Sequence, residues 1–489
     1  MTPGALFTDL YQLTMAQGYW RAGVAEREVV FHLWYRRNPF DGGYALAAGM
    51  EAAIEYLRVL RFLPDDLDYL GTLQAADGSP LFEPGFLRHL EQFEFGCDVD
   101  MVPEGTVVFP HEPLVRVRGP VLQAQVIETA LLNQVNFPTL IATKAARVCH
   151  AAGGDAVLEF GLRRAQGTDG GLSASRAAFI GGCTATSNVL AGRRYGIPVR
   201  GTHAHSWVLL FGDEAEAFAQ YAAAMPNNVV LLVDTYDSLQ GVRHAIDVGH
   251  ALRERGQRLQ AVRLDSGDLA HLSREARRLL DEAGLTDTRI LASNDLDEHT
   301  IADIRRQGGR VDTWAVGTRL VTGHDQGALG GVYKLSAVRS PAGVWEYRVK
   351  LSEQSEKVTT PGSLQVRRFR QGGEYAGDVI YDTLGPPPGD TVLIVDPADP
   401  IRRKRLGPDA DTEDLLVPVF RGGTLVYSPP PLAETQARAR TQLAGFHEGI
   451  KRFSNPHRYP AGLDERLYRR RAALLLAARG LGDGSGSQE

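Results

Sequence analysis

Six short apolar segments in the middle of the chain are each followed by side chains that can bind or transfer charged groups. The residues concerned are Phe160 and Arg163; Thr202, His203 and His205; Asp234; Arg263, Asp265 and Asp268; Ser293 and Asn294; and Gly317 and Thr318. Any single Asp or Asn at such a position has an ordinary role in a turn or a helix cap. Six consecutive segment ends of this kind instead predict an active site on one face of the fold.

These residue types suit chemistry on a sugar phosphate. Gly317 and Thr318 offer backbone N–H groups and a hydroxyl to a phosphate, although the pair also fits a plain strand-to-helix turn. Asp265 and Asp268 can bind ribose hydroxyls or a Mg²⁺ ion that carries pyrophosphate. For Asp268 the alternative is a helix cap, because a predicted helix follows at Leu269.

Two arginines and one phenylalanine add capacity for anionic and aromatic groups. Arg163 and Arg263 can each pair with a carboxylate or a phosphate through two hydrogen bonds, or form a salt bridge with a loop aspartate. Phe160 can stack on an aromatic ring, whereas a phenylalanine at a strand end is by default a core residue.

His203 and His205 are separated by one residue, so in an extended segment their side chains point the same way. This arrangement also fits a metal pair and therefore a metal-dependent barrel hydrolase. Such a site needs further histidine ligands at later strand ends. Those ends carry Asp, Asn and Gly instead, and His244, His250 and His271 fall in predicted helices.

The elements that must position these residues alternate between strands and helices. We predict strands at residues 156–160, 197–200, 229–233, 261–264, 289–292 and 314–316, and helices at 215–225, 239–255, 273–283 and 300–307. Ser238 is expected to cap the second helix and Gly256 to end it. The alternation predicts a buried parallel sheet, either open or closed into a barrel, with chemistry at the carboxyl ends of its strands.

Both flanks of this region mix helices with strands. Helices are predicted at residues 10–21, 49–60 and 84–93, and strands at 106–109, 114–117, 332–335, 347–350, 392–395 and 424–427. We therefore predict a β-rich second domain that is assembled from both flanks. The predicted parts are residues 1–130, the catalytic domain 131–331, the β-rich part 332–430 and a helical segment 431–489, whose tail at 482–487 is expected to be disordered.

Composition excludes several classes of function. The chain has 489 residues and a net charge of -6, which argues against a broad nucleic-acid surface. Its 3 cysteines show no CxxC spacing, which fits a reducing cytoplasm. The N-terminus lacks the features of a secretory signal, and no stretch approaches the roughly 20 apolar residues of a membrane span.

The motifs together resemble those of nicotinate phosphoribosyltransferases. They are TDLYQLTM at 8–15, GTHAHSW at 201–207, LDSGD at 264–268, SNDL at 293–296, VGTR at 316–319 and RFSNPHRYP at 452–460. They occur in the family's order over nearly the whole chain. The resemblance implies an irregular (β/α) barrel of the type II phosphoribosyltransferase kind, a β-rich flanking domain built from both flanks, and a homodimer with its active site at the interface.

The resemblance also implies an ATP-dependent ligase of NAD salvage. ATP would phosphorylate His205, and the phosphohistidine would couple ATP hydrolysis to formation of nicotinate mononucleotide and pyrophosphate from nicotinate and phosphoribosyl pyrophosphate. Phe160 and Tyr11 match the aromatic pair around the pyridine ring, with Tyr11 and the neighbouring Asp9 supplied by the partner subunit. Mg²⁺ is the expected cofactor, with Asp268 as a candidate ligand.

The resemblance implies roles for further residues at positions that match the family's motifs. Arg163 and Arg263 match residues near the substrate phosphate and the base carboxylate, with Arg263 and Asp265 in the catalytic group. Asp265 matches a carboxylate on the ribose side. The resemblance implies substrate contacts for a further set, namely Thr202, Ser293, Asn294, Gly317 and Thr318.

One position bears on the choice of base. Related enzymes that use nicotinamide carry an Asp in the segment aligned with residues 181–184, where it accepts hydrogen bonds from the amide. The uncharged Cys183 at this position favours the acid, because an Asp would repel its carboxylate. Lys144 and Arg147 either contact a ligand or face solvent on a helix, and solvent is favoured. A non-catalytic nucleotide sensor that does not depend on His205 is a further alternative.

Overall fold

The computed structural model describes residues 4–354 and 357–481, and the chain divides into two compact units. Unit 1 combines Met1–Leu140 with Ala328–Glu489, and unit 2 is Ile141–Gly327. The predicted disordered tail at 482–487 lies outside the described residues. The long helix α6, Glu128–Ala152, crosses the boundary between the units in the sequence.

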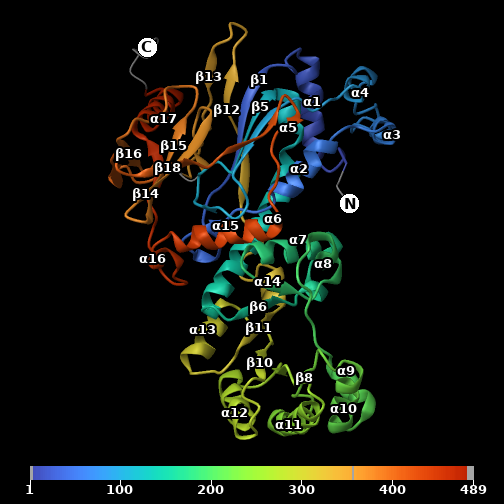
Figure 1. The fold of residues 1–489 in the computed structure, drawn as a ribbon. Coiled ribbons are helices and arrows are strands. Elements are labelled where there is room, and N and C mark those ends of the chain that lie inside the picture. Colours follow the sequence, from blue (N-terminus) through green and yellow to red (C-terminus); the bar gives the residue numbers. More distant parts are fainter. Residues whose placement is uncertain (1–3, 355–356, 482–489) are drawn as a thin grey trace. The chain divides into compact units, whose positions relative to one another are not determined.

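Unit 2 is built on a six-stranded parallel sheet in the order β7-β6-β11-β10-β9-β8 (Figure 1). Its strands are β6 (Ala156–Glu159), β7 (Ala185–Thr186), β8 (Val230–Leu232), β9 (Ala261–Leu264), β10 (Arg289–Ala292) and β11 (Thr313–Val316). Its helices are α7 (Gly167–Ile180), α8 (Val189–Tyr195), α9 (His205–Phe211), α10 (Glu214–Ala224), α11 (Ser238–Glu254), α12 (Leu269–Glu282), α13 (Glu298–Arg306) and α14 (Thr318–Val321). Because all the strands are parallel, their carboxyl ends share one edge.

Five of the six predicted strands of this region are confirmed, and one is wrong. Residues 197–200 form only an isolated bridge between Thr186 and Val199. Pro198 lacks the N–H group that a ladder requires, which explains the failure. The place beside β6 is taken by the two-residue strand β7, which was not predicted because its length leaves no periodic signal.

The four helices predicted after these strands are confirmed, and each begins behind an aspartate. Asp213, Asp237, Asp268 and Asp297 each accept the N–H group of the residue three positions later. The expected cap at Ser238 is wrong, because that residue is already the first of α11. A carboxylate at the helix start satisfies a free N–H and interacts favourably with the helix dipole.

Unit 1 interleaves the two flanks of the chain in a seven-stranded sheet of order β13-β12-β1-β5-β3-β19-β20. Its strands are β1 (Glu28–Tyr35), β3 (Asp98–Met101), β5 (Val115–Pro120), β12 (Gly331–Arg339), β13 (Trp345–Tyr347), β19 (Val417–Arg421) and β20 (Thr424–Leu425). Strand β1 pairs with β12 on one side and β5 on the other, so neither flank can complete this sheet alone.

A second sheet of unit 1 comes from the carboxyl flank, in the order β17-β16-β21-β15-β14-β18. It contains β14 (Leu364–Gln371), β15 (Glu374–Asp382), β16 (Val392–Val395), β17 (Arg403–Leu406), β18 (Asp411–Asp414) and β21 (Ala461–Asp464), while β2 (Ala45–Leu46) pairs with β4 (Val107–Val108). Strand β21 corrects the prediction of an entirely helical segment after residue 431. The strand predicted at 347–350 ends at Tyr347.

The helices of unit 1 are α1 (Leu10–Arg21), α2 (Met50–Val59), α3 (Pro64–Thr72), α4 (Pro84–Glu91), α5 (Val121–Val126), α15 (Leu432–Ala444), α16 (Glu448–Lys451) and α17 (Glu465–Ala478). Apolar residues from both flanks form one core cluster, in which Phe31 stacks on Tyr333. Among the described residues, no helix combines the length and apolarity that crossing a membrane requires.

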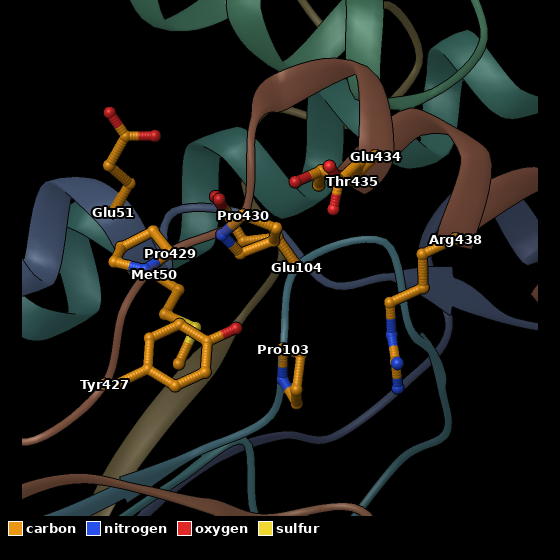
Figure 2. A pocket seen from close by; sticks show the side chains of 10 residues that line it. All are labelled: Met50, Glu51, Pro103, Glu104, Tyr427, Pro429, Pro430, Glu434, Thr435 and Arg438. Carbon is orange, nitrogen blue, oxygen red and sulfur yellow. The ribbon is translucent and has the colours of Figure 1, made fainter.

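Figure 2 shows a pocket of about 260 Å³ in unit 1, lined by Met50, Glu51, Pro103, Glu104, Tyr427, Pro429, Pro430, Glu434, Thr435 and Arg438. Glu104 accepts the N–H group of Gly49 at 2.7 Å, and Arg438 donates to Thr106 at 3.0 Å and to Glu413 at 3.1 Å. These charged groups already serve the packing of unit 1. None of the residues predicted to do chemistry lines this pocket, and most of those residues lie in unit 2.

Candidate active site

Arg263 is the centre of a polar cluster at the carboxyl edge of the unit 2 sheet. Its Nε donates to Ser293 Oγ at 2.9 Å, and its terminal nitrogens donate to Thr202 Oγ1 and Asp265 Oδ1, each at 3.0 Å. Ser293 also donates to Asp265. The guanidinium carbon lies 6.0 Å from the centre of the Phe160 ring. Five predicted site residues from four chain segments are therefore brought together.

His205 is the first residue of α9 and faces two carboxylates. Its Nδ1 lies 3.1 Å from Thr235 Oγ1, while Nε2 lies 3.8 Å from Asp265 Oδ2 and 4.0 Å from Asp234 Oδ1. The His205 side chain is 42% exposed, whereas that of Asp234 is 1% exposed. The ring is thus oriented by a hydrogen bond and remains open to a large ligand.

Asp234 and Thr235 follow β8 and make contacts with other site residues that the sequence did not predict. Asp234 Oδ2 accepts the N–H group of Asp265 at 2.9 Å and the hydroxyl of Ser266 at 2.6 Å. Its Oδ1 is buried and has no hydrogen-bond partner among the described residues. A buried carboxylate oxygen without a partner is costly, so this atom is suited to accept a proton donor or a cation. In the sequence, only the position of Asp234 at the end of a predicted strand indicated that it belongs to the site.

His203 does not form a metal pair with His205. Its Nε2 accepts the N–H group of Leu232 at 3.1 Å, and its Nδ1 lies 3.3 Å from the carbonyl oxygen of the next residue. The ring packs edge-on against Tyr221, and burial lowers the pKa of His203. Both ring nitrogens therefore serve the fold. Within the described residues, no group of at least 3 His, Cys, Asp or Glu side chains is arranged to hold a metal.

Replacing His203 with glutamine should flatten the dependence of stability on pH. Because the pKa of His203 is lower in the folded protein than in the unfolded chain, the unfolded chain binds more protons below about pH 6.5. The free energy of unfolding then falls as the pH falls, by at most about 1.4 kcal/mol per pH unit for one such group. Glutamine does not titrate but keeps an acceptor for Leu232.

Urea unfolding of both proteins at about pH 7.5 and about pH 5 measures this effect. An unchanged pH dependence in the glutamine variant would contradict it.

Glu159 ends β6 and holds the following loop in place. This buried carboxylate accepts hydrogen bonds from the N–H group of Gly161 at 2.5 Å and from the hydroxyls of Ser175 at 2.8 Å and Thr186 at 2.5 Å. A Cβ atom on Gly161 would lie 2.3 Å from the side chain of Val321. Only glycine therefore lets the loop after β6, which carries Phe160, approach the helix after β11.

The loops after β10 and β11 are tied to each other. Asn294 and Asp295 have φ values of 96° and 37°, in the left-handed region that Asn and Asp tolerate better than most residues. Arg319 forms an ion pair with Asp297, the cap of α13. Burial opposes ionisation of Asp297, but hydrogen bonds from Thr300 and Arg319 outweigh it and lower the pKa of this carboxyl.

Gly317 and Thr318 lie at the same edge of the sheet. A Cβ atom on Gly317 would lie 3.2 Å from the carbonyl oxygen of Phe160, so the two loops are in close contact. The Thr318 hydroxyl makes no hydrogen bond to any described residue. It is therefore available to a ligand.

Arg163 and Asp268 lie on exposed loops of this edge. Within the part of the chain that the structure describes, the Arg163 guanidinium has no hydrogen bond or ion pair, so it is an available cation. Asp268 Oδ1 accepts the N–H group of His271 at 3.0 Å and caps α12. The helix-cap alternative for Asp268 is therefore correct, and its role as a Mg²⁺ ligand stays a prediction.

Replacing Asp268 with alanine should lower the free energy of unfolding by about 1 kcal/mol, because the first turn of α12 loses its cap. Serine at the same position should restore most of the loss, since its hydroxyl caps helices nearly as well. Thermal or urea unfolding of the two variants measures this difference. Equal stability of both variants would show that capping by Asp268 contributes nothing.

Asp9 and Tyr11 belong to unit 1, whereas the cluster belongs to unit 2. Tyr11 lies on α1 with 48% of its surface exposed, and Asp9 accepts the hydroxyl of Thr129 at 2.7 Å. Burial, followed by the charges of Glu128 and Asp9, raises the pKa of Tyr11.

Lys144 and Arg147 do not face solvent, contrary to expectation. Both side chains are at most 3% exposed, and both pair with the buried Glu298 at 2.8 Å. These pairs join α6 to α13, the helix that follows the Ser293 loop. Removal of one partner would leave buried charge uncompensated, so the residues serve the packing of unit 2.

Cys183 does not line the cavity beside Phe160; its neighbour Thr184 does. A hydrogen bond with Cys149 of α6, together with burial, raises the pKa of the Cys183 thiol. The alternation of side chains along an extended segment accounts for the difference of one position. The residue that faces the cavity is uncharged, as Cys183 is.

This arrangement can hold a sugar phosphate beside an aromatic ring. Hydroxyl and carboxylate groups converge around Arg263, an accessible imidazole lies next to two carboxylates, and Arg163 supplies a free cation at the rim. Preorganised groups of this kind stabilise charge that develops in a transition state without reorganising.

Comparisons with known proteins show which family the chain resembles. Family models match for the nicotinate phosphoribosyltransferase (NAPRTase) N-terminal domain over residues 6–136 and the C-terminal domain over residues 365–471. The chain is 43% identical over 476 residues to nicotinate phosphoribosyltransferase of Bacillus subtilis, covering 94% of this chain and 93% of the relative. It is 44% identical over 394 residues to nicotinate phosphoribosyltransferase pncB2 of Mycobacterium tuberculosis, covering 80% and 81%.

The solved structures include a close match to the fold. The crystal structure of human nicotinic acid phosphoribosyltransferase has a TM-score of 0.83 and 34% identity, and the match covers 96% of this chain and 99% of that one. The predicted fold is thereby confirmed: an irregular α/β barrel of the type II phosphoribosyltransferase kind with a β-rich domain from both flanks. The chain belongs to the nicotinate phosphoribosyltransferase family.

Proposed function

We propose that this enzyme joins nicotinate to the phosphoribosyl group of phosphoribosyl pyrophosphate, releasing nicotinate mononucleotide and pyrophosphate, in NAD salvage in the cytoplasm. The observation that carries the proposal is the cluster around Arg263, which joins Thr202, Asp265 and Ser293 beside Phe160 and next to His205. The relatives named above bear this activity in their names.

The base is positioned rather than activated by proton transfer. Nicotinate would stack on Phe160, with its carboxylate paired to Arg163 and its ring nitrogen directed at the anomeric carbon of the ribose. The nitrogen–carbon bond forms as the carbon–oxygen bond to pyrophosphate breaks, and the pair of electrons leaves with pyrophosphate. Asp265 would stabilise the positive charge that builds on the sugar.

His205 would accept the γ-phosphoryl group of ATP on a ring nitrogen, releasing ADP. The exposure of this ring and its hydrogen bond with Thr235 support the assignment, because a nucleophile must be both accessible and oriented. Water later cleaves the phosphohistidine to histidine and phosphate. The phosphate adds about -1.5 to -2 charges beside Asp234 and Asp265, by analogy with other phosphorylated side chains.

The carboxylates of Asp234 and Asp265 would hold the Mg²⁺ ion. Asp234 Oδ1 and Asp265 Oδ2 lack hydrogen-bond partners among the described residues, whereas Asp268 already uses one oxygen as a cap. Mg²⁺ is typically held by one or two carboxylates together with phosphate oxygens and water. When bound, it would neutralise the charge of the leaving pyrophosphate. We therefore propose Asp234 and Asp265 as ligands and keep Asp268 as an outer candidate.

The active form would be a homodimer in which Asp9 and Tyr11 serve the partner's site. Phe7, Leu10 and Tyr11 expose apolar surface on unit 1, and Leu209 and Leu210 expose 59% and 76% of theirs on α9 of unit 2. Apolar surface of this kind marks interaction sites.

Assays of pyrophosphate release with nicotinate, nicotinamide and quinolinate, each with and without ATP, test the proposal. Of the three bases, we expect only nicotinate to be turned over, and we expect ATP to stimulate that turnover. Turnover with nicotinamide or quinolinate at a comparable rate would contradict the choice of base, and binding of phosphoribosyl pyrophosphate without turnover would identify a sensor instead.

A further inference from the structure

A cavity of about 560 Å³ lies inside the unit 2 barrel and extends away from the catalytic edge. Phe160 and Thr202 line its end at that edge, and Ala156 and Arg289 line its opposite end, where strands β6 and β10 begin. Strand β10 spans four residues at about 3.3 Å each, so Arg289 lies roughly 10 Å below the catalytic edge. Cavities of this size hold small molecules in other proteins.

The cavity exists because the barrel is neither filled nor closed. Inward positions at the starts of β6 and β9 carry Ala156 and Ala261, where barrels usually place bulky branched side chains. The edge strands β7 and β8 are not paired with each other; the segment 198–203 lies between them and is hydrogen-bonded to Thr186 of β7 and Leu232 of β8. Arg258 and Arg289 line the cavity and are exposed, so the cavity opens to solvent at its amino-terminal end and ligands can enter without passing the catalytic loops.

The middle of the cavity is apolar and one end is positively charged. Leu158 and Leu291 line the middle, and Val230 lies toward the amino-terminal end, beside Ala261, which pairs with Arg289. The amino-terminal end carries Arg258 and Arg289, whose guanidinium groups have no hydrogen bond or ion pair to any residue in the described ranges.

Two further charged groups line the same cavity. Arg200 donates to the adjacent backbone carbonyl at 3.0 Å, and Asp287 lies 3.9 Å from Arg253. Three arginines against one carboxylate leave the lining net positive. Unpaired guanidinium groups at the end of an apolar cavity are suited to a carboxylate with an apolar body.

We propose that the barrel interior is a second small-molecule site, which binds an elongated aromatic carboxylate. The rings lie among Leu158, Val230 and Leu291, and the carboxylate pairs with Arg258 and Arg289 at the amino-terminal end. The site shares Phe160, Thr184 and Thr202 with the base site and is distinct from it in its charged contacts. Binding can be measured directly, so the proposal does not depend on the assigned activity.

Calorimetric titration of the full chain with biphenyl-4-carboxylate and with its neutral carboxamide tests this site. The carboxylate should bind, and the carboxamide should bind at least about tenfold more weakly, because it cannot form charge-assisted hydrogen bonds with guanidinium groups. A double variant, Arg258→Gln with Arg289→Gln, should lose the carboxylate affinity by at least about tenfold. Both arginines are exposed, so these substitutions leave the core intact.

Ala261→Leu fills the cavity from β9 and should abolish binding. Arg255→Gln removes an exposed arginine from the loop before β9 that does not line the cavity, so it should bind as the unaltered protein does. An aromatic acid held at the base site would bind all of these variants equally, and that result would overturn the proposal. So would the absence of any binding to the unaltered protein.

Discussion

Replacing His205 with asparagine should abolish the stimulation of nicotinate mononucleotide formation by ATP. Asparagine has no imidazole nitrogen to accept a phosphoryl group, so the ratio of rates with and without ATP should fall to about one. The cluster around Arg263 makes no hydrogen bond to His205, so the rate without ATP should persist. Parallel assays of product formation and of ADP release measure both quantities.

A matched variant separates this effect from a general loss of structure. His250 lies exposed on α11 outside the cluster, and its replacement with asparagine should leave the ATP stimulation unchanged. If the His205 variant is still stimulated by ATP, the phosphoryl acceptor is a different residue. If it loses the ATP-independent rate as well, the histidine has a role in the transfer step itself.

Replacing Arg263 with alanine should lower kcat/KM for nicotinate by about 100- to 1000-fold, a loss typical of removing one preorganised charge-stabilising group. The guanidinium organises Thr202, Asp265 and Ser293 through three hydrogen bonds. Without it, these groups lose both their orientation and a compensating positive charge. Lysine should rescue little, because a single ammonium cannot reproduce the fork of donors.

Steady-state kinetics together with thermal unfolding test this prediction. Arg255→Ala, on an exposed position before the same strand, is the control and should retain activity. If a folded Arg263 variant loses less than about tenfold in kcat/KM for nicotinate, the cluster does not organise the site. A variant that fails to fold would leave Arg263→Gln as the informative substitution, because glutamine can keep one of the three hydrogen bonds.

The arrangement of unit 2 was predictable because its strands are apolar and its helices carry start and stop signals. Arg263, Asp265 and Ser293 could be placed at one edge of the sheet from their positions at the carboxyl ends of β9 and β10 alone. The failed strand at 197–200 shows the limit of this reasoning. Proline removes a hydrogen-bond donor from an otherwise apolar segment, and the two-residue strand that replaces it has no period to detect.

The contacts that complete the site were not predictable from local sequence. Asp234 and Glu159 resemble ordinary strand-end residues, and only the fold shows that they bind the loops of other strands. Lys144 and Arg147 read as solvent-facing residues of a helix because the sequence does not show their distant partner, Glu298. Long-range ion pairs of this kind depend on the tertiary fold and not on periodicity.

The barrel cavity is likewise a property of the tertiary fold. Ala156 and Ala261 are unremarkable in a strand, and their small size matters only because they face the same interior. The tertiary fold also decides that Thr184, and not Cys183, lines the cavity. A shift of one position in an extended segment exchanges the side chain that faces the cavity for the one that faces α6.

The phosphorylation state of His205 tests the central claim most directly. The protein is incubated with ATP and Mg²⁺ alone, digested under alkaline conditions that preserve phosphohistidine, and examined by tandem mass spectrometry. We expect one phosphoryl group on His205, which disappears when nicotinate and phosphoribosyl pyrophosphate are added. A phosphoryl group on another residue, or an unmodified His205 while the enzyme turns over ATP, would contradict the account.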